Sequence, residues 1–230
     1  SMENFDDPWW TPIPFSFPLP EKKIALLTKI EGLKIDPRIV EELNKAAKKL
    51  EQIGWIIEEP KAPNFQEAAN YQATLWLGEF RRTGGEAISK ENDPDANFIY
   101  SQMCRRCPDT SLEKFMDSLQ NRARISREWN KFFDQYPIIL CPITGDIPFP
   151  DLKDLESEES FDLVFDSMLS QIAPPYMGLP GLSFATNKTK EKIPLGLQLI
   201  SRKYREDLLL NVAYDLEKYY PKIDVVLPSY

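Results

Sequence analysis

Two cysteines spaced three positions apart are the most suggestive chemical pattern in this sequence. Cys104 and Cys107 enclose two arginines, and this CxxC spacing occurs in redox and zinc sites. A structural zinc site needs four ligands, whereas the remaining cysteine, Cys141, falls in a distant apolar stretch. Arg105 and Arg106 could lower the pKa of a thiol, as redox chemistry requires. Without further motif context, the pair is interpreted as two reduced thiols, and a redox or metal role is the alternative.

Two other patterns resemble known sites but have simpler interpretations. Ser111 and Lys114 match the SxxK pattern, in which a lysine activates a serine one helical turn away. The partner motifs of that chemistry are missing, so Ser111 is predicted to cap a helix. Asp93, Asp95 and Asn97 alternate like the start of a calcium loop but lack its later glycine and glutamate, so a solvated loop is expected. The sequence predicts no catalytic residue, no cofactor and no metal site in this chain.

The composition excludes several classes of chemistry and binding. The 230 residues include no histidine, so the chain cannot form a Ser-His-Asp triad, a Cys-His pair or a histidine-ligated zinc site. A net charge of −8 disfavours general binding to nucleic acid or to an anionic membrane. No apolar run approaches the ~18 residues of a membrane span. The acidic beginning and the odd number of cysteines favour the reducing cytoplasm.

The chain is expected to divide into an arm and one domain. Residues 1–20 combine prolines with large aromatic side chains. Proline fixes φ and lacks an N–H, so this stretch can form neither a helix nor a central strand. We expect an extended N-terminal arm that lies on an apolar surface. Residues 21–230 are expected to form a single α/β domain.

Periodicity and capping residues predict alternating strands and helices after the arm. The first predicted unit is a βαβ unit with parallel strands. It consists of a strand over 22–28, a helix from Asp36-Pro37 to Gly54 and a strand over 55–58. Further helices are expected over 64–82, 111–136, 161–172 and 205–220, and further strands over 137–141, 182–185 and 194–201. No element is predicted over 86–110, and Pro174-Pro175 is expected to end a helix. The alternation implies an α/β sandwich, a mixed sheet with helices on both faces.

Several stretches resemble the C-terminal half of the amidase-signature family. They are residues 7–14 (DPWWTPIP), the strand-helix-strand over 23–54, Trp129–Pro142 (with Cys141 where threonine is usual), Gly178–Ser183 and Ile193–Ile200. The last of these, which resembles the family's late PxGxQ strand, is the most specific. The resemblance covers about residues 6–220 and implies a partial amidase-like α/β/α sandwich.

The resemblance implies amide chemistry, but the reactive groups of the family lie elsewhere. The family hydrolyses amides with a serine nucleophile, a second serine in a cis peptide and a lysine base, all upstream of the matched region. No position in this sequence corresponds to them. The expected function is therefore non-catalytic, that of a truncated form or pseudoenzyme that acts by binding and assembly, and this chain alone is not expected to be an enzyme. The alternative is part of a complete serine amidase that hydrolyses C–N amide bonds, with the two serines and the lysine supplied by an N-terminal half.

The same resemblance implies a pocket wall and a covered surface. By their places in the motif, Gly178, Pro180 and Ser183 are expected to form part of a pocket wall. The family's sheet is shared between its two halves, so this half alone would expose strand edges that invite pairing. We therefore expect a homo-oligomer, or a partner chain that covers the exposed sheet. The expected contact residues are the large aromatics of the arm, Trp9, Trp10, Phe15 and Phe17.

Overall fold

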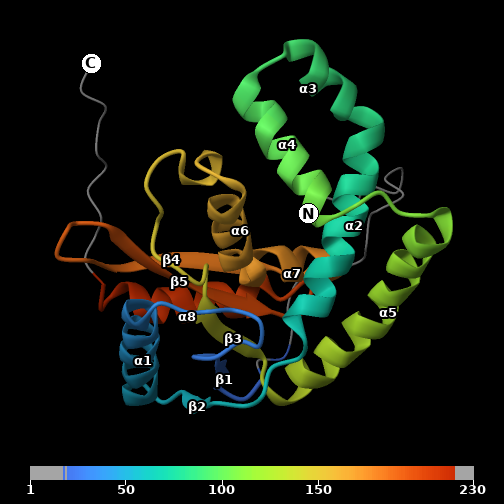
Figure 1. The fold of residues 1–230 in the computed structure, drawn as a ribbon. Coiled ribbons are helices and arrows are strands. Elements are labelled where there is room, and N and C mark those ends of the chain that lie inside the picture. The colour runs from blue at the N-terminus through green and yellow to red at the C-terminus, as the bar shows by residue number, and fades with distance from the viewer. Residues whose placement is uncertain (1–17, 19, 221–230) are drawn as a thin grey trace, which may run out of the picture.

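A mixed five-stranded sheet forms the centre of the computed structural model, which describes Pro18 and residues 20–220 (Figure 1). The strands are β1 (Lys23–Leu26), β2 (Ile56–Glu58), β3 (Ile138–Pro142), β4 (Gly181–Lys188) and β5 (Pro194–Ser201). Their order is β2-β1-β3-β5-β4. Strand β1 runs parallel to β2 and β3, whereas β5 runs antiparallel to β3 and β4. The predicted α/β class with a mixed sheet is confirmed.

Helices cover both faces of this sheet, as predicted (Figure 1). One face packs on α1 (Pro37–Gln52) and α8 (Glu206–Glu217), and the other on α2 (Phe65–Thr83), α5 (Leu112–Gln135) and α7 (Leu169–Met177). Successive side chains of a strand point to opposite faces. Ile24 and Leu26 therefore join the α1–α8 core, whereas Ala25 joins the α2–α5–α7 core.

The predicted βαβ unit is present at the start of the described chain. The Asp36 carboxylate accepts a hydrogen bond from the backbone N–H of Arg38, and Pro37 opens α1. Gly54 follows the helix with φ +90°, a conformation that favours glycine. The chain then returns parallel to β1, with Lys23 opposite Ile56. The two strands therefore end at the same edge of the sheet.

The stretch for which no element was predicted contains two helices. Helices α3 (Gly85–Glu91) and α4 (Pro94–Arg106) extend beyond the end of α2, away from the sheet, and are called the helical projection below (Figure 1). The solvated loop expected at Asp93 is wrong, because the Asp93 carboxylate caps α4 by accepting from the N–H groups of Asp95 and Ala96. In α4, all of whose residues are described, only Gln102 is buried. So little burial explains the weak hydrophobic period.

The two adjacent prolines lie inside a helix and do not end one. The chain forms α6 (Glu158–Ser167) and then α7, which continues through Pro174 and Pro175 to Met177. Pro174 has no N–H to donate to the carbonyl of Ser170. The side chain of Gln198 on β5 donates to that carbonyl at 3.3 Å. A neighbouring strand thus satisfies the acceptor that the proline leaves open.

The connection from β3 to α6 contains a short 3-10 helix, η1 (Lys153–Leu155).

Of the helices within the described residues, none is both long and apolar enough to cross a membrane. The division into an arm and one domain stays a prediction, because residues 1–17 lie outside the described part.

Candidate functional site

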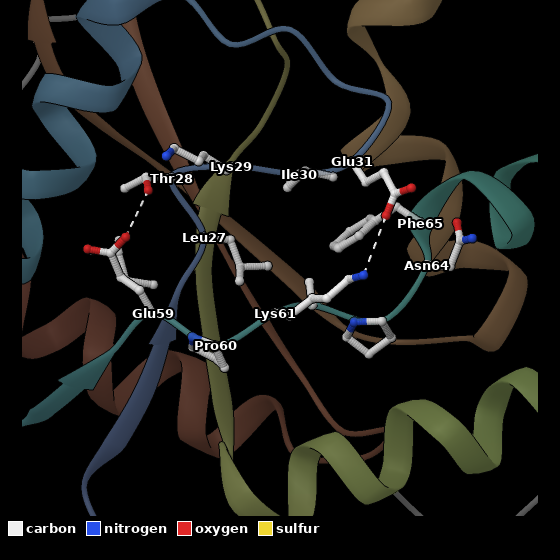
Figure 2. A pocket seen from close by; sticks show the side chains of 13 residues that line it. Leu27, Thr28, Lys29, Ile30, Glu31, Glu59, Pro60, Lys61, Asn64 and Phe65 are labelled. Atoms are coloured by element: carbon white, nitrogen blue, oxygen red, sulfur yellow. Dashed lines mark hydrogen bonds and ion pairs between the residues drawn. The ribbon is translucent and has the colours of Figure 1, made fainter.

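A pocket lies where β1 and β2 end, and we call it the strand-end pocket (Figure 2). It has a volume of about 650 Å³ and is lined by residues 26–31, at and after the end of β1, and by residues 59–65, which lead from β2 into α2. In open sheets with parallel strands, ligands bind beyond the carboxyl ends of those strands. The βαβ unit therefore creates this pocket.

Polar side chains surround the opening of the strand-end pocket, and apolar ones form its floor. Figure 2 shows the Thr28 hydroxyl, which donates to the Glu59 carboxylate at 3.0 Å. Across the opening, Lys61 Nζ lies 3.9 Å from Glu31, and both side chains are more than 80% exposed, at 88% and 82%. Such an exposed pair adds little stability, so both groups are available to a ligand. Buried Leu27 forms part of the floor.

Next to this pocket, a charged cluster joins the sheet to α5. Lys23 Nζ lies 2.8 Å from the Glu58 carboxylate, which also accepts from the Tyr136 hydroxyl at 2.8 Å. The hydrogen bond from Lys23, and then that from Tyr136, lowers the pKa of Glu58. The bond to Glu58 in turn raises the pKa of Lys23 and of Tyr136. Each group is thereby held in its ordinary charge state, which suits a structural contact and not a general base.

A second cavity lies between α2, α7 and the connection from α4 to α5, and we call it the interhelix hollow. Its volume is about 460 Å³. Its polar lining includes Asn70, Thr74, Cys107 and Lys114, and the Thr74 hydroxyl lies 4.0 Å from the Cys107 sulfur. Leu169 contributes to its apolar side. Polar groups gathered beside an apolar wall are typical of small-molecule sites.

Gly32 brings the two cavities together. It has φ +84°, a backbone conformation that favours glycine. A Cβ at this position would lie 3.0 Å from the Gln66 side-chain oxygen and 3.6 Å from Leu169, both of which line the interhelix hollow. The segment that leaves β1 therefore passes from one cavity directly to the other. The two cavities form neighbouring parts of one surface around the first turns of α2.

This surface can bind a ligand but does not carry a complete set of reacting groups. The SxxK pair is a helix cap, as predicted, because the Ser111 oxygen accepts from the backbone N–H of Lys114 at 3.3 Å. Residues 20–220 contain no group of three or more His, Cys, Asp and Glu side chains that could hold a metal ion. Cys104 and Cys107 are free, half-buried thiols. Arg105 and Arg106 lie between the two cysteines in sequence, and both donate hydrogen bonds to the Asp162 carboxylate on α6.

The three residues expected in a pocket wall lie on the connection from α7 to β4 and on β4. Gly178 ends α7 with φ +67°, and the Pro180 carbonyl accepts from the backbone N–H of Ser201 at 3.3 Å. Ser183 is exposed on β4, where it lines a different hollow, between β4 and α8. None of the three lines the strand-end pocket or the interhelix hollow. Their role as a pocket wall stays a prediction.

The aromatic residues expected at an interface, Trp9, Trp10, Phe15 and Phe17, lie outside the described residues.

Sequence reasoning missed the polar residues of the strand-end pocket, Thr28, Glu31, Glu59 and Lys61. A signal for them was present, because they directly follow the two strands of the predicted βαβ unit. The interhelix hollow offered no such signal, since the sequence placed no element over 86–110.

Comparison with known families and structures identifies the fold. The sequence model of the family described as Amidase matches residues 16–210, most of the chain. The chain belongs to the amidase family. Solved structures share the fold: 6-aminohexanoate cyclic dimer hydrolase superposes with a TM-score of 0.74 at 16% identity, over 96% of this chain and 51% of that one. Fatty acid amide hydrolase superposes with a TM-score of 0.72 at 17% identity, over 90% of this chain and 42% of that one.

Curated relatives of this amidase-family chain include hydrolases and one component of an amidotransferase. Indoleacetamide hydrolase of Bradyrhizobium diazoefficiens is 28% identical over 94% of this chain and 42% of its own length. A glutamyl-tRNA(Gln) amidotransferase subunit of Streptococcus suis is 31% identical over 85% of this chain and 44% of its own length. The chain thus spans about half the length of the curated relatives it matches. The expectation that this chain is not an enzyme is contradicted, because the chain matches the amidase family and its curated relatives include indoleacetamide hydrolases.

Proposed function

We propose that this chain forms the substrate-side part of an amide hydrolase that cleaves C–N bonds. The match of the amidase family over residues 16–210 is the observation that carries the proposal. The interhelix hollow adds physical support, because the side-chain N–H of Asn70 can donate to an uncharged amide group and the Thr74 hydroxyl, whose proton goes to the Asn70 carbonyl, can accept from it. Its apolar side can hold the remainder of such a substrate. The reacting serines and lysine implied by the family resemblance would come from outside the matched residues.

The β4 edge of the sheet supports a partner surface. In the part of the chain that the structure describes, β4 pairs with β5 on one side and with no strand on the other. An unpaired edge strand is a template for further pairing. We propose that further amidase-fold structure, from the same or another polypeptide, covers this edge. The Streptococcus suis relative is itself named as one subunit of an amidotransferase, which agrees with assembly from parts.

A fusion protein tests the proposed function. Residues 16–230 would replace the matching part of the Bradyrhizobium indoleacetamide hydrolase, and ammonia release from indole-3-acetamide would be measured. The fusion is expected to release ammonia at a rate above that of the same hydrolase with the matching part deleted. Circular dichroism and thermal unfolding would establish that the fusion is folded. A folded fusion that is no faster than the deletion would refute the proposal.

A further inference from the structure

A groove between α2 and α5 combines an exposed arginine with an apolar floor, and we call it the α2–α5 groove. It has a volume of about 750 Å³. Its apolar lining includes Leu75, Leu112, Phe115 and Leu119, and Arg122 lies beyond Leu119 on α5. Leu112 is 78% exposed and Leu119 is 41% exposed, so the groove presents apolar side chains to solvent. The groove is separate from the interhelix hollow, although the connection from α4 to α5 borders both.

Helix geometry gives the groove its length and its floor. The α5 residues 112, 115, 119 and 122 recur at spacings that place them on one face of the helix. At 1.5 Å per residue, Leu112 and Arg122 are about 15 Å apart along the axis. Gly78 allows α2 to approach this face, because a Cβ there would lie 2.9 Å from the ring of Phe115. A continuous apolar strip therefore leads from Leu112 to Arg122.

Arg122 is held in place without a carboxylate partner among residues 20–220. Its guanidinium lies over the ring of Tyr176, 5.3 Å from the centroid. Tyr176 is itself buried, and its hydroxyl donates to the Ser118 carbonyl. No ion pair of Arg122 occurs among the described residues, whereas nearby Arg124 pairs with Glu67 and Glu128. Arg122 is thus a pre-positioned cation in a chain whose net charge is −8.

The opposite end of the groove is electrically balanced. Arg81 lies 3.9 Å from Asp109 and also donates to the Cys107 carbonyl. Glu79 and Arg82 add one charge of each sign to the lining. A single anionic group is therefore best accommodated at Arg122, and the rest of the ligand extends toward the neutral end.

We propose that the α2–α5 groove binds an amphiphilic carboxylate. Its head group forms charge-assisted hydrogen bonds with Arg122, and such bonds are among the strongest in proteins. Its unbranched apolar tail lies along Leu119 and Phe115 toward Leu112 and removes their exposed surface from water. The proposal does not depend on the proposed hydrolase function, because it concerns binding by this chain alone.

Isothermal titration with decanoate tests the proposal on the full chain, at concentrations below micelle formation. Wild type is expected to bind decanoate saturably, and Arg122→Gln to weaken the affinity about tenfold, the scale of a lost hydrogen bond to a charged group. Decanol, which lacks the charge, should bind wild type about as weakly as decanoate binds the variant. Leu112→Ser should weaken decanoate and decanol alike.

The matched control is Arg127→Gln, which removes an exposed arginine from the same helix outside the groove. It should leave decanoate affinity unchanged. Because Arg122, Leu112 and Arg127 are all exposed, these variants should fold like wild type, and circular dichroism checks this. The proposal is overturned if folded wild type shows no saturable binding. It is equally overturned if Arg122→Gln binds as well as wild type, or if Arg127→Gln weakens binding as much as Arg122→Gln.

Discussion

The central sheet and the helical projection differ in how deeply their side chains are buried. Every residue of β3 is buried, with apolar side chains of both cores on either side. In the helical projection, whose two helices are fully described, α3 has one buried residue, Gly85, and α4 has one, Gln102. Instead, Arg105 and Arg106 at the end of α4 bind Asp162 on α6, and Arg106 also pairs with Asp166. Deep burial therefore defines the sheet, whereas the projection is attached by ion pairs to α6 and by half-buried contacts such as that of Tyr100 with Phe80.

The largest expected effect comes from the sheet. Leu140 on β3 is fully buried at 0% exposure, so Leu140→Ala should lower the free energy of unfolding by about 2–5 kcal/mol. Urea denaturation measures the loss. The control Leu112→Ala removes a leucine that is 78% exposed and should change it by less than about 0.5 kcal/mol. If both variants lost the same free energy of unfolding, burial of the side chain would not determine how much each leucine stabilises the fold.

An intermediate effect is expected where the sheet supports a helix. Gln198→Met removes the donor to the Ser170 carbonyl and keeps a side chain of similar length. A buried acceptor left unsatisfied costs about 1–3 kcal/mol, so urea denaturation should show a loss in that range. Gln120→Met on the exposed side of α5 is the control and should be nearly neutral. A neutral Gln198→Met would mean that α7 does not need this bond.

The same contrast explains what the sequence could predict. The βαβ unit was predictable because Asp36, Pro37 and Gly54 mark α1 and an apolar period runs between them. Helix α4 has an equally good start in Asp93 and Pro94, but its apolar residues are only half-buried, and its contacts combine ion pairs with α6 and the ring contact of Tyr100 with Phe80 on α2. The Ser170 carbonyl that Pro174 leaves open in α7 accepts a hydrogen bond from Gln198, which is far away in sequence. Local patterns cannot reveal a contact of that kind.

A smaller effect is expected at the helical projection. Asp162 accepts from Arg105 at 2.6 Å and from Arg106 at 2.7 Å, so Asp162→Asn should weaken both contacts. Because the Asp162 side chain is 33% exposed, the loss in the free energy of unfolding should be on the order of 0.5–1 kcal/mol. Amide hydrogen exchange should speed up in α4 and stay unchanged in β3. Faster exchange in both would contradict the independence of the two regions.

The pH dependence of this contact has a defined direction. Hydrogen bonds from Arg105 and then Arg106 lower the pKa of Asp162. A carboxyl whose folded pKa is lowered stabilises the fold fully above its unfolded pKa of about 3.9, and that contribution is lost as pH falls through the folded pKa. The stability difference between wild type and Asp162→Asn should therefore be constant near neutral pH and shrink below about pH 4. A difference that grows on acidification would exclude this ion pair as its source.

The candidate site shows a similar division. The strand-end pocket follows from where two predicted parallel strands end, so its residues could be located from sequence. The interhelix hollow needs the connection after α4 to lie beside Thr74 on α2, and no local pattern predicts that approach. The resemblance to amidases identified the family but not this hollow.

The most direct test of the account is steady-state kinetics of the fused hydrolase with a substitution in the interhelix hollow. Thr74→Val keeps the side-chain shape and removes the hydroxyl that lines the hollow. If the hollow holds the amide substrate, KM should rise about tenfold, the equivalent of one lost hydrogen bond at about 1.4 kcal/mol, while the exposed control Gln120→Met leaves KM unchanged. An unchanged KM in a folded Thr74→Val protein would contradict the claim that this chain provides the substrate-binding side of an amide hydrolase.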